Sequence, residues 1–85
     1  MLHSKRVEST SPTVAVSVTQ WDDETGEAER SEYGHDGRLV RRAVVERFPR
    51  EAWTDDVVGE AIWFDGNGQE VRRAPVLLGR PNLLD

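Results

Sequence analysis

The sequence contains no cysteine, so neither a disulfide nor a zinc site with thiolate ligands can stabilise the fold. It has two histidines, His3 and His35, and neither has a second histidine or a cysteine at metal-binding spacing. No apolar run reaches the length of a spanning helix, and residues 1–12 lack the apolar core of a signal peptide. We therefore expect a cytoplasmic protein with no metal, no cofactor and no membrane contact.

Catalytic motifs are also absent from the sequence. There is no Gly-x-Ser-x-Gly elbow, no phosphate-binding glycine loop and no dinucleotide fingerprint. Neighbouring carboxylates occur at Asp22/Asp23 and at Asp55/Asp56. Both pairs lie in turn-forming segments, where aspartate usually bonds to nearby backbone rather than serving as an acid or base. We expect that the protein is not an enzyme.

The chain has 85 residues, of which 36% are apolar, and a formal net charge of −5. Such a length makes one small domain, which buries only about 60% of its unfolded surface. Extra stability must come from good packing, self-association or a partner. The negative charge disfavours non-specific binding to nucleic acid and is compatible with a protein partner that has a basic surface.

Alternating and β-branched segments predict a mainly β fold, a small antiparallel sheet of about five strands built from hairpins. Residues 13–21 alternate valine with small polar residues, which is typical of a half-buried strand. Residues 27–33 are polar on both faces and predict an edge strand. Residues 38–48 and 60–64 follow as strands, and residues 69–78 carry Pro75, so that segment either lies at an edge of the sheet or bends at the proline.

One short helix near residues 49–57 is compatible with the sequence, because Pro49 suits a first helical position. A longer helix there would make the fold α+β, which is the alternative. We expect residues 1–12 to form a flexible tail, residues 13–79 a single β-rich domain, and residues 80–85 a C-terminal tail.

Two dipeptides, Asp36-Gly37 and Asn67-Gly68, predict hairpins with two-residue type I′ turns. Those turns would place Glu32 opposite Arg41 and Trp63 opposite Arg72. Each dipeptide is followed by a return strand containing Val-Arg-Arg-Ala, and the two copies are offset by 31 residues. Two hairpins that reached the same geometry independently, or a true duplication, would both explain the pattern.

Each Arg-Arg pair puts one guanidinium on each face of its strand, because neighbouring side chains alternate. We take Arg41 and Arg72 as candidate binding residues, with Arg72 stacked on Trp63. Trp53 is the candidate exposed anchor, because it lies in the least regular segment and tryptophan contributes strongly to binding. The candidate partner-binding residues are Trp53, Asp55, Asp56, Asp22, Asp23, Arg41 and Arg72.

Three hypotheses of function follow. The first is a non-enzymatic protein-interaction module, such as a small inhibitor, immunity or phage-encoded anti-defence protein, whose acidic turns occlude a basic partner surface. The second is a structural or assembly protein that forms a homo-oligomer by pairing hairpin edges at residues 27–33 or 71–78. The third is a nucleic-acid binder that uses the strand arginines, and the net charge of −5 disfavours it.

Overall fold

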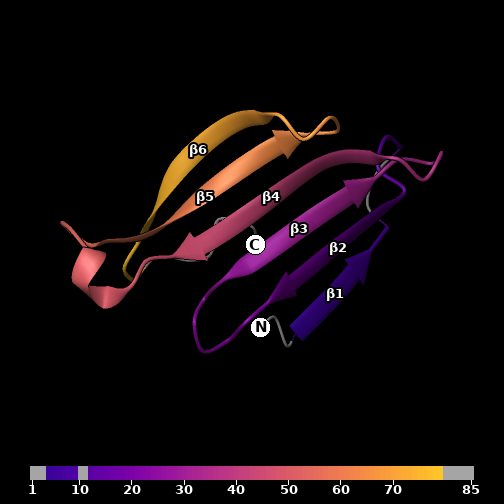
Figure 1. The fold of residues 1–85 in the computed structure, drawn as a ribbon. Helices are drawn as coiled ribbons and strands as arrows, with labels where there is room; N and C mark the ends of the chain where they lie inside the picture. Colours follow the sequence, from indigo (N-terminus) through magenta and orange to yellow (C-terminus); the bar gives the residue numbers. More distant parts are fainter. Residues whose placement is uncertain (1–3, 10–11, 80–85) are drawn as a thin grey trace.

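The computed structural model describes residues 4–9 and 12–79. Six strands form one open antiparallel sheet in which each strand pairs with its neighbours in the sequence (Figure 1). The strands are β1 (Ser4–Glu8), β2 (Val16–Trp21), β3 (Ala28–Tyr33), β4 (Leu39–Arg47), β5 (Val57–Asp65) and β6 (Glu70–Leu77). The mainly β fold is confirmed. A single 3-10 turn, η1 (Arg50–Ala52), occupies the segment where a short helix was considered, so the α+β alternative is wrong.

Strand β1 lies inside the stretch that we expected to be a flexible tail. Val7 pairs with Val18, and Lys5 pairs with Gln20. The side chains of residues 4–8 show no apolar periodicity, but the unpaired backbone groups of β2 offer a pairing edge whatever the side chains are. The sheet therefore has six strands rather than about five. Residues 1–3, 10–11 and 80–85, including the predicted C-terminal tail, lie outside the described residues.

The prediction that residues 27–33 form an edge strand is wrong, because β3 pairs with β2 on one side and β4 on the other. Its long polar side chains find partners across the sheet. Arg42 donates to Glu29 at 3.0 Å, and Arg41 pairs with Glu32. A central strand can thus be polar when both of its faces reach solvent. The edge position predicted for residues 69–78 is correct, since β6 pairs with β5 alone.

The β3–β4 hairpin has a three-residue loop rather than the predicted type I′ turn. The Gly34 and Arg38 backbones are joined by a hydrogen bond of 2.9 Å, and only Gly37 takes a positive φ, +78°. Asp36 is not left-handed; its Oδ1 accepts from the Arg38 N–H. A three-residue loop that ends in a left-handed glycine is the next most common hairpin connection after two-residue turns.

The β5–β6 hairpin repeats this geometry 31 residues later. Asp65 donates its N–H to the carbonyl of Gln69, and Gly68 has a φ of +82°. In each hairpin the pairing register then shifts by one residue, which leaves Val40 and Val71 as bulges. The bulges restore the register given by a two-residue turn, so the pairs Glu32–Arg41 and Trp63–Arg72 are confirmed although the predicted turn type is wrong.

The apolar core lies on one face of the sheet, because residues paired across neighbouring strands share a face. We call it the Trp face, since it carries Trp21 and Trp63. Its centre is built from small side chains that lie beside one another across the strands: Ala28, Ala43, Val45, Ala61 and Val76. Val58, at a register shift in β5, is fully buried against them, and Trp53 packs over the same cluster.

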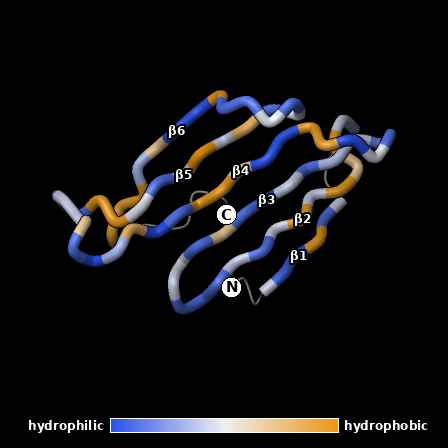
Figure 2. Tube along the Cα trace, in the orientation of Figure 1, coloured by the Kyte–Doolittle hydropathy of each residue, from blue (hydrophilic) through white to orange (hydrophobic). Residues whose placement is uncertain are grey.

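The opposite face is a mixture of apolar and charged side chains. Val18, Val44 and Ile62 lie among ion pairs such as Arg73 with Glu60 at 2.7 Å. Figure 2 shows polar and apolar residues interspersed along the strands. Within the described residues no helix and no second sheet covers either face, and the molecule extends 43 × 25 × 20 Å. The sheet is therefore a single layer, whereas most domains have two.

Candidate functional site

The two acidic turns lie at the same end of the sheet. Because β-strands in a meander alternate in direction, the β2–β3 turn and the β4–β5 connection both fall at the end where β2 and β4 finish (Figure 1). We call this the acidic end. It gathers acids from residues 22–27 and 51–56: Asp22, Asp23, Glu24, Glu27, Glu51, Asp55 and Asp56. Two candidate pairs that are 33 residues apart in sequence are thus brought to one region.

Asp22 holds its own turn together. It is only 5% exposed, and its Oδ1 accepts hydrogen bonds from the N–H groups of Glu24 at 2.8 Å and Thr25 at 3.2 Å. Asp23 is exposed, and its two carboxylate oxygens accept from Trp21 Nε1 at 2.9 Å and Ser4 Oγ at 3.1 Å. Asp23 therefore remains accessible to a partner while it ties β1 and β2 to the turn. Asp22 is buried and is not accessible.

Asp55 and Asp56 are exposed at the tip of a small hairpin. Thr54 and Val57 exchange two backbone hydrogen bonds, of 3.3 and 2.7 Å, and both aspartates have positive φ, +48° and +67°. This is the type I′ arrangement that the sequence predicted elsewhere. Asn-Gly is the preferred pair for such a turn, so two aspartates cost conformational free energy there. Leu78 holds the tip of this turn, because its N–H donates to the Asp56 carbonyl at 2.8 Å.

Trp53 is half-buried rather than free on the surface. Its indole packs against the core cluster, its Nε1 donates to the Phe48 carbonyl at 3.0 Å, and the Arg50 guanidinium lies 5.4 Å from its ring centroid. The side chain thus closes the acidic end of the core. Its role as a partner anchor stays a prediction.

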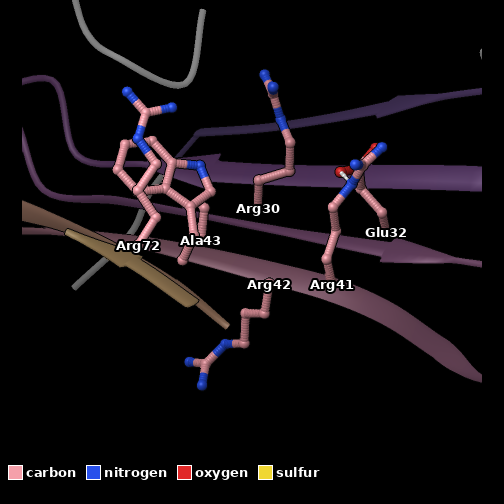
Figure 3. A pocket seen from close by; sticks show the side chains of 7 residues that line it. Arg30, Glu32, Arg41, Arg42, Ala43 and Arg72 are labelled. Atoms are coloured by element: carbon pink, nitrogen blue, oxygen red, sulfur yellow. Dashed lines mark hydrogen bonds and ion pairs between the residues drawn. The ribbon is translucent and has the colours of Figure 1, made fainter. Parts of the chain in front are cut away.

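Arg41 and Arg72 share the Trp face, although they are separated by β5. Figure 3 shows Arg30, Arg41 and Arg72 extending from the same side of the strands, and Arg42 pointing to the other side. Together with Glu32, Ala43 and Trp63 they line an open pocket of about 290 Å³. Arg72 lies 4.6 Å from the Trp63 ring centroid, so the predicted cation-π contact is confirmed.

Arg30 is a pocket residue that the sequence analysis missed. It pairs directly with Ala43, and Ala43 pairs with Trp63, which places all three in one row across the sheet. Its Nε donates to Thr19 Oγ1 at 3.0 Å. The signal was the register of β3 against β4, which carries Arg30 to the same face as Arg41 once Glu32 is opposite Arg41.

The opposite face holds the strongest electrostatic coupling. Arg73 lies between Glu70 and Glu60, with contacts of 2.5 and 2.7 Å. Hydrogen bonding to Arg73 lowers the pKa of Glu70, and hydrogen bonds to Glu70 and Glu60 raise the pKa of Arg73. Arg73 and Glu70 are exposed and Glu60 is half-buried, and the cluster joins β5 to β6 rather than forming a reactive site.

Within residues 4–9 and 12–79, no three histidine or acidic side chains gather in a way that could hold a metal ion. The same part of the chain contains no helix long and apolar enough to cross a membrane. Comparison with known proteins gives no match: no family model, curated protein or solved structure is similar to this chain. The class that the structure defines is a mainly β protein with one open six-stranded meander.

Proposed function

We propose that the chain is a non-enzymatic protein-interaction module that occludes a basic surface of a partner protein with its acidic end. The observation that carries the proposal is that no second layer covers the sheet within residues 4–9 and 12–79. A sheet with an apolar face is normally covered by a second layer, which completes the core. Here the three tryptophans that border the core are only half-buried. A partner docked at the acidic end would add cover over Trp21 and Trp53, which lie at that end of the sheet.

Charge complementarity selects the chemistry of that partner. The acidic end has seven carboxylates, and basic residues near them include Arg47 beside Gly26, Arg50 in η1 and Arg6 over the Trp21 ring. Asp23, Asp55 and Asp56 are exposed, and Asp55 and Asp56 make no ion pair with another described residue. A surface rich in lysine and arginine would attract this end and would associate fast at low salt. Small inhibitors that cover a nucleic-acid-binding surface act in this way.

The test uses a double substitution that separates binding from folding. Asp55→Asn with Asp56→Gly gives the preferred type I′ pair and removes two negative charges from the acidic end. We expect the free energy of unfolding to rise by about 1 kcal/mol. We expect the recovery of co-purified basic proteins from a lysate of the source cell to fall.

Asp36→Asn is the matched control, because Asp36 is an exposed turn aspartate at the other end of the sheet. It should leave recovery unchanged. The recovered proteins are identified by mass spectrometry, and only those lost with the double variant and retained with the control count as partners. Equal recovery by all three proteins would sink the proposal.

Self-association is a second candidate function, favoured by one observation. The free edge of β6 exposes Val71 (63%) and Leu77 (37%), so a second copy could pair there. Of the two edges considered from the sequence, residues 27–33 are occupied on both sides and only residues 71–78 remain. Light scattering distinguishes the candidates: a mass of 9.6 kDa at every concentration removes self-association.

A further inference from the structure

We propose that the pocket on the Trp face is a binding site for a phosphate monoester, held by Arg30 and Arg72 with Arg41 at its rim. This goes beyond the proposed function and does not depend on it, because the pocket lies on the strands and the acidic end lies in the turns. The ligand chemistry is a terminal, doubly charged phosphate, carried either by a small molecule or by a phosphorylated side chain.

The backbone register builds the floor and walls of the pocket. Arg30, Ala43, Trp63 and Arg72 are consecutive partners in one row across β3, β4, β5 and β6. Ala43 is 5% exposed and has a short side chain, so it leaves space between Arg30 and the Trp63 indole. Three strand spacings of about 4.8 Å separate the ends of the row. Arg30 and Arg72 therefore stand at the two ends of the pocket, with Ala43 and Trp63 between them.

The charge of the lining fits a dianion. Arg30, Arg41 and Arg72 face the pocket, and Glu32 is the one carboxylate among its lining residues. Arg42 also borders it, but its guanidinium points to the opposite face, where it pairs with Glu29 at 3.0 Å. Two positive charges therefore remain in the pocket. A phosphate monoester carries about −1.5 to −2 at neutral pH, whereas a carboxylate or a phosphodiester carries −1.

Two of these guanidinium groups are not matched by acids of the described residues, although acids outnumber basic residues 16 to 11 in the chain. Arg72 has a ring contact with Trp63 but no ion pair with a described residue. Arg30 bonds through Nε to Thr19, which fixes the side chain, and its two terminal nitrogens have no carboxylate partner in the part of the chain that the structure describes. Arginine held in place with free donors is well suited to bind phosphate in a bidentate way.

Arg72 also covers the Trp63 ring, so a substitution there could weaken packing as well as binding. The experiment therefore measures both. Phenyl phosphate is titrated into the whole chain by calorimetry and by NMR of the arginine Nε–H groups. Dimethyl phosphate and acetate serve as singly charged probes, and urea unfolding of each variant is recorded beside its titration.

We expect saturable binding of phenyl phosphate that weakens below about pH 6, where the dianion takes up a proton. Arg30→Gln and Arg72→Gln should each weaken it by about tenfold, the effect of one charge-assisted hydrogen bond. Arg30→Lys keeps the charge but loses the planar guanidinium that can bind phosphate through two nitrogens. Its affinity for phenyl phosphate should fall between those of wild type and Arg30→Gln. Arg42→Gln is the matched control on the opposite face and should bind like wild type.

The proposal is overturned by three results: no saturable binding, equal loss in Arg42→Gln, or binding of acetate and dimethyl phosphate as tight as that of phenyl phosphate. Tighter binding of a single-stranded oligonucleotide without a terminal phosphate would also overturn it, and would revive the nucleic-acid hypothesis.

A phosphoserine peptide that binds tighter than phenyl phosphate identifies a protein as the source of the phosphate; a peptide that binds less tightly identifies a small molecule. The two proposals are tested separately, because the double variant at Asp55 and Asp56 should lose its basic partner and still bind phenyl phosphate.

Discussion

Gly59 and Gly66 lie in β5 and its loop, where the neighbouring backbone of β4 comes closest. A Cβ on Gly59 would be 2.1 Å from the Glu46 carbonyl oxygen, and a Cβ on Gly66 would be 2.5 Å from the Leu39 carbonyl oxygen. Neither obstacle is a flexible side chain. At both positions the absence of a side chain is what lets the two strands pair at this spacing.

Gly59→Ala should therefore force the backbones of β4 and β5 apart and lower the free energy of unfolding by about 2–3 kcal/mol. Gly68→Ala is the control, because its Cβ would meet nothing within 4 Å and only the left-handed φ of +82° opposes it. That change should cost about 1 kcal/mol. Urea unfolding followed by far-UV circular dichroism gives both values. A smaller loss for Gly59→Ala than for Gly68→Ala would contradict the close approach.

Single residues of the site were predictable only where the alternation of a strand was clear. The predicted turns placed Arg41 opposite Glu32 and Arg72 opposite Trp63, but only the structure shows that the two arginines share a face. Arg30 lies two residues from Glu32 and therefore on the same face, and it was missed because residues 27–33 have no apolar pattern that draws attention to one face. The burial of Asp22 also escaped prediction, since Asp22 and Asp23 are the same residue type and only the folded turn distinguishes them.

Among the elements, β6 is attached to the sheet along one side only, and an ion cluster reinforces that side. Arg73 of β6 contacts Glu60 of β5 and Glu70 of its own strand. The pKa of Glu70 lies below its ordinary value of 4.5 because of the hydrogen bond from Arg73. A carboxylate with a lowered pKa stabilises the fold above its ordinary pKa, and that contribution disappears as the pH falls through the lowered value.

Glu70→Gln should accordingly lower Tm at neutral pH, and the difference from wild type should shrink as the pH is lowered from 4.5. A high salt concentration should also reduce this difference in Tm, because Arg73 and Glu70 are exposed to solvent. Thermal melts over this range measure the effect. Glu24→Gln, at a carboxylate without an ion pair to a described residue, should show no comparable trend. A difference that grows in acid would mean that Arg73 does not stabilise the Glu70 carboxylate.

Element by element, the sequence predicted the strands better than their places in the sheet. The alternation in residues 13–21 and the turn glycines gave β2 and both long hairpins. The predicted places of β1 and β3 were wrong, because a segment with polar side chains on both faces is normally an edge strand or a tail. That rule assumes that a second layer covers one face of the sheet. In a sheet that is one layer thick, polar side chains on either face can pair across strands, as Glu29 and Arg42 do.

At the scale of the whole molecule, the sheet that the described residues form is one layer thick, and this should be visible in the fluorescence of its tryptophans. Trp21, Trp53 and Trp63 are all half-buried. We expect acrylamide to quench the fluorescence of the folded protein more strongly than that of a fully buried tryptophan, and dilution to leave quenching unchanged. Protection from acrylamide that is lost on dilution would show instead that a second copy covers the Trp face.

The two bulges have a consequence for how this chain tolerates genetic change. Val40 and Val71 are each the extra residue in a strand whose other residues are matched one to one. Losing the codon of either valine would turn a bulge into a regular ladder and leave every later side chain on its present face. Losing a codon anywhere between Ala43 and Val45 would reverse the faces beyond that point and expose the core. In-frame deletions can therefore accumulate beside the two loops, while the middle of each strand is closed to them.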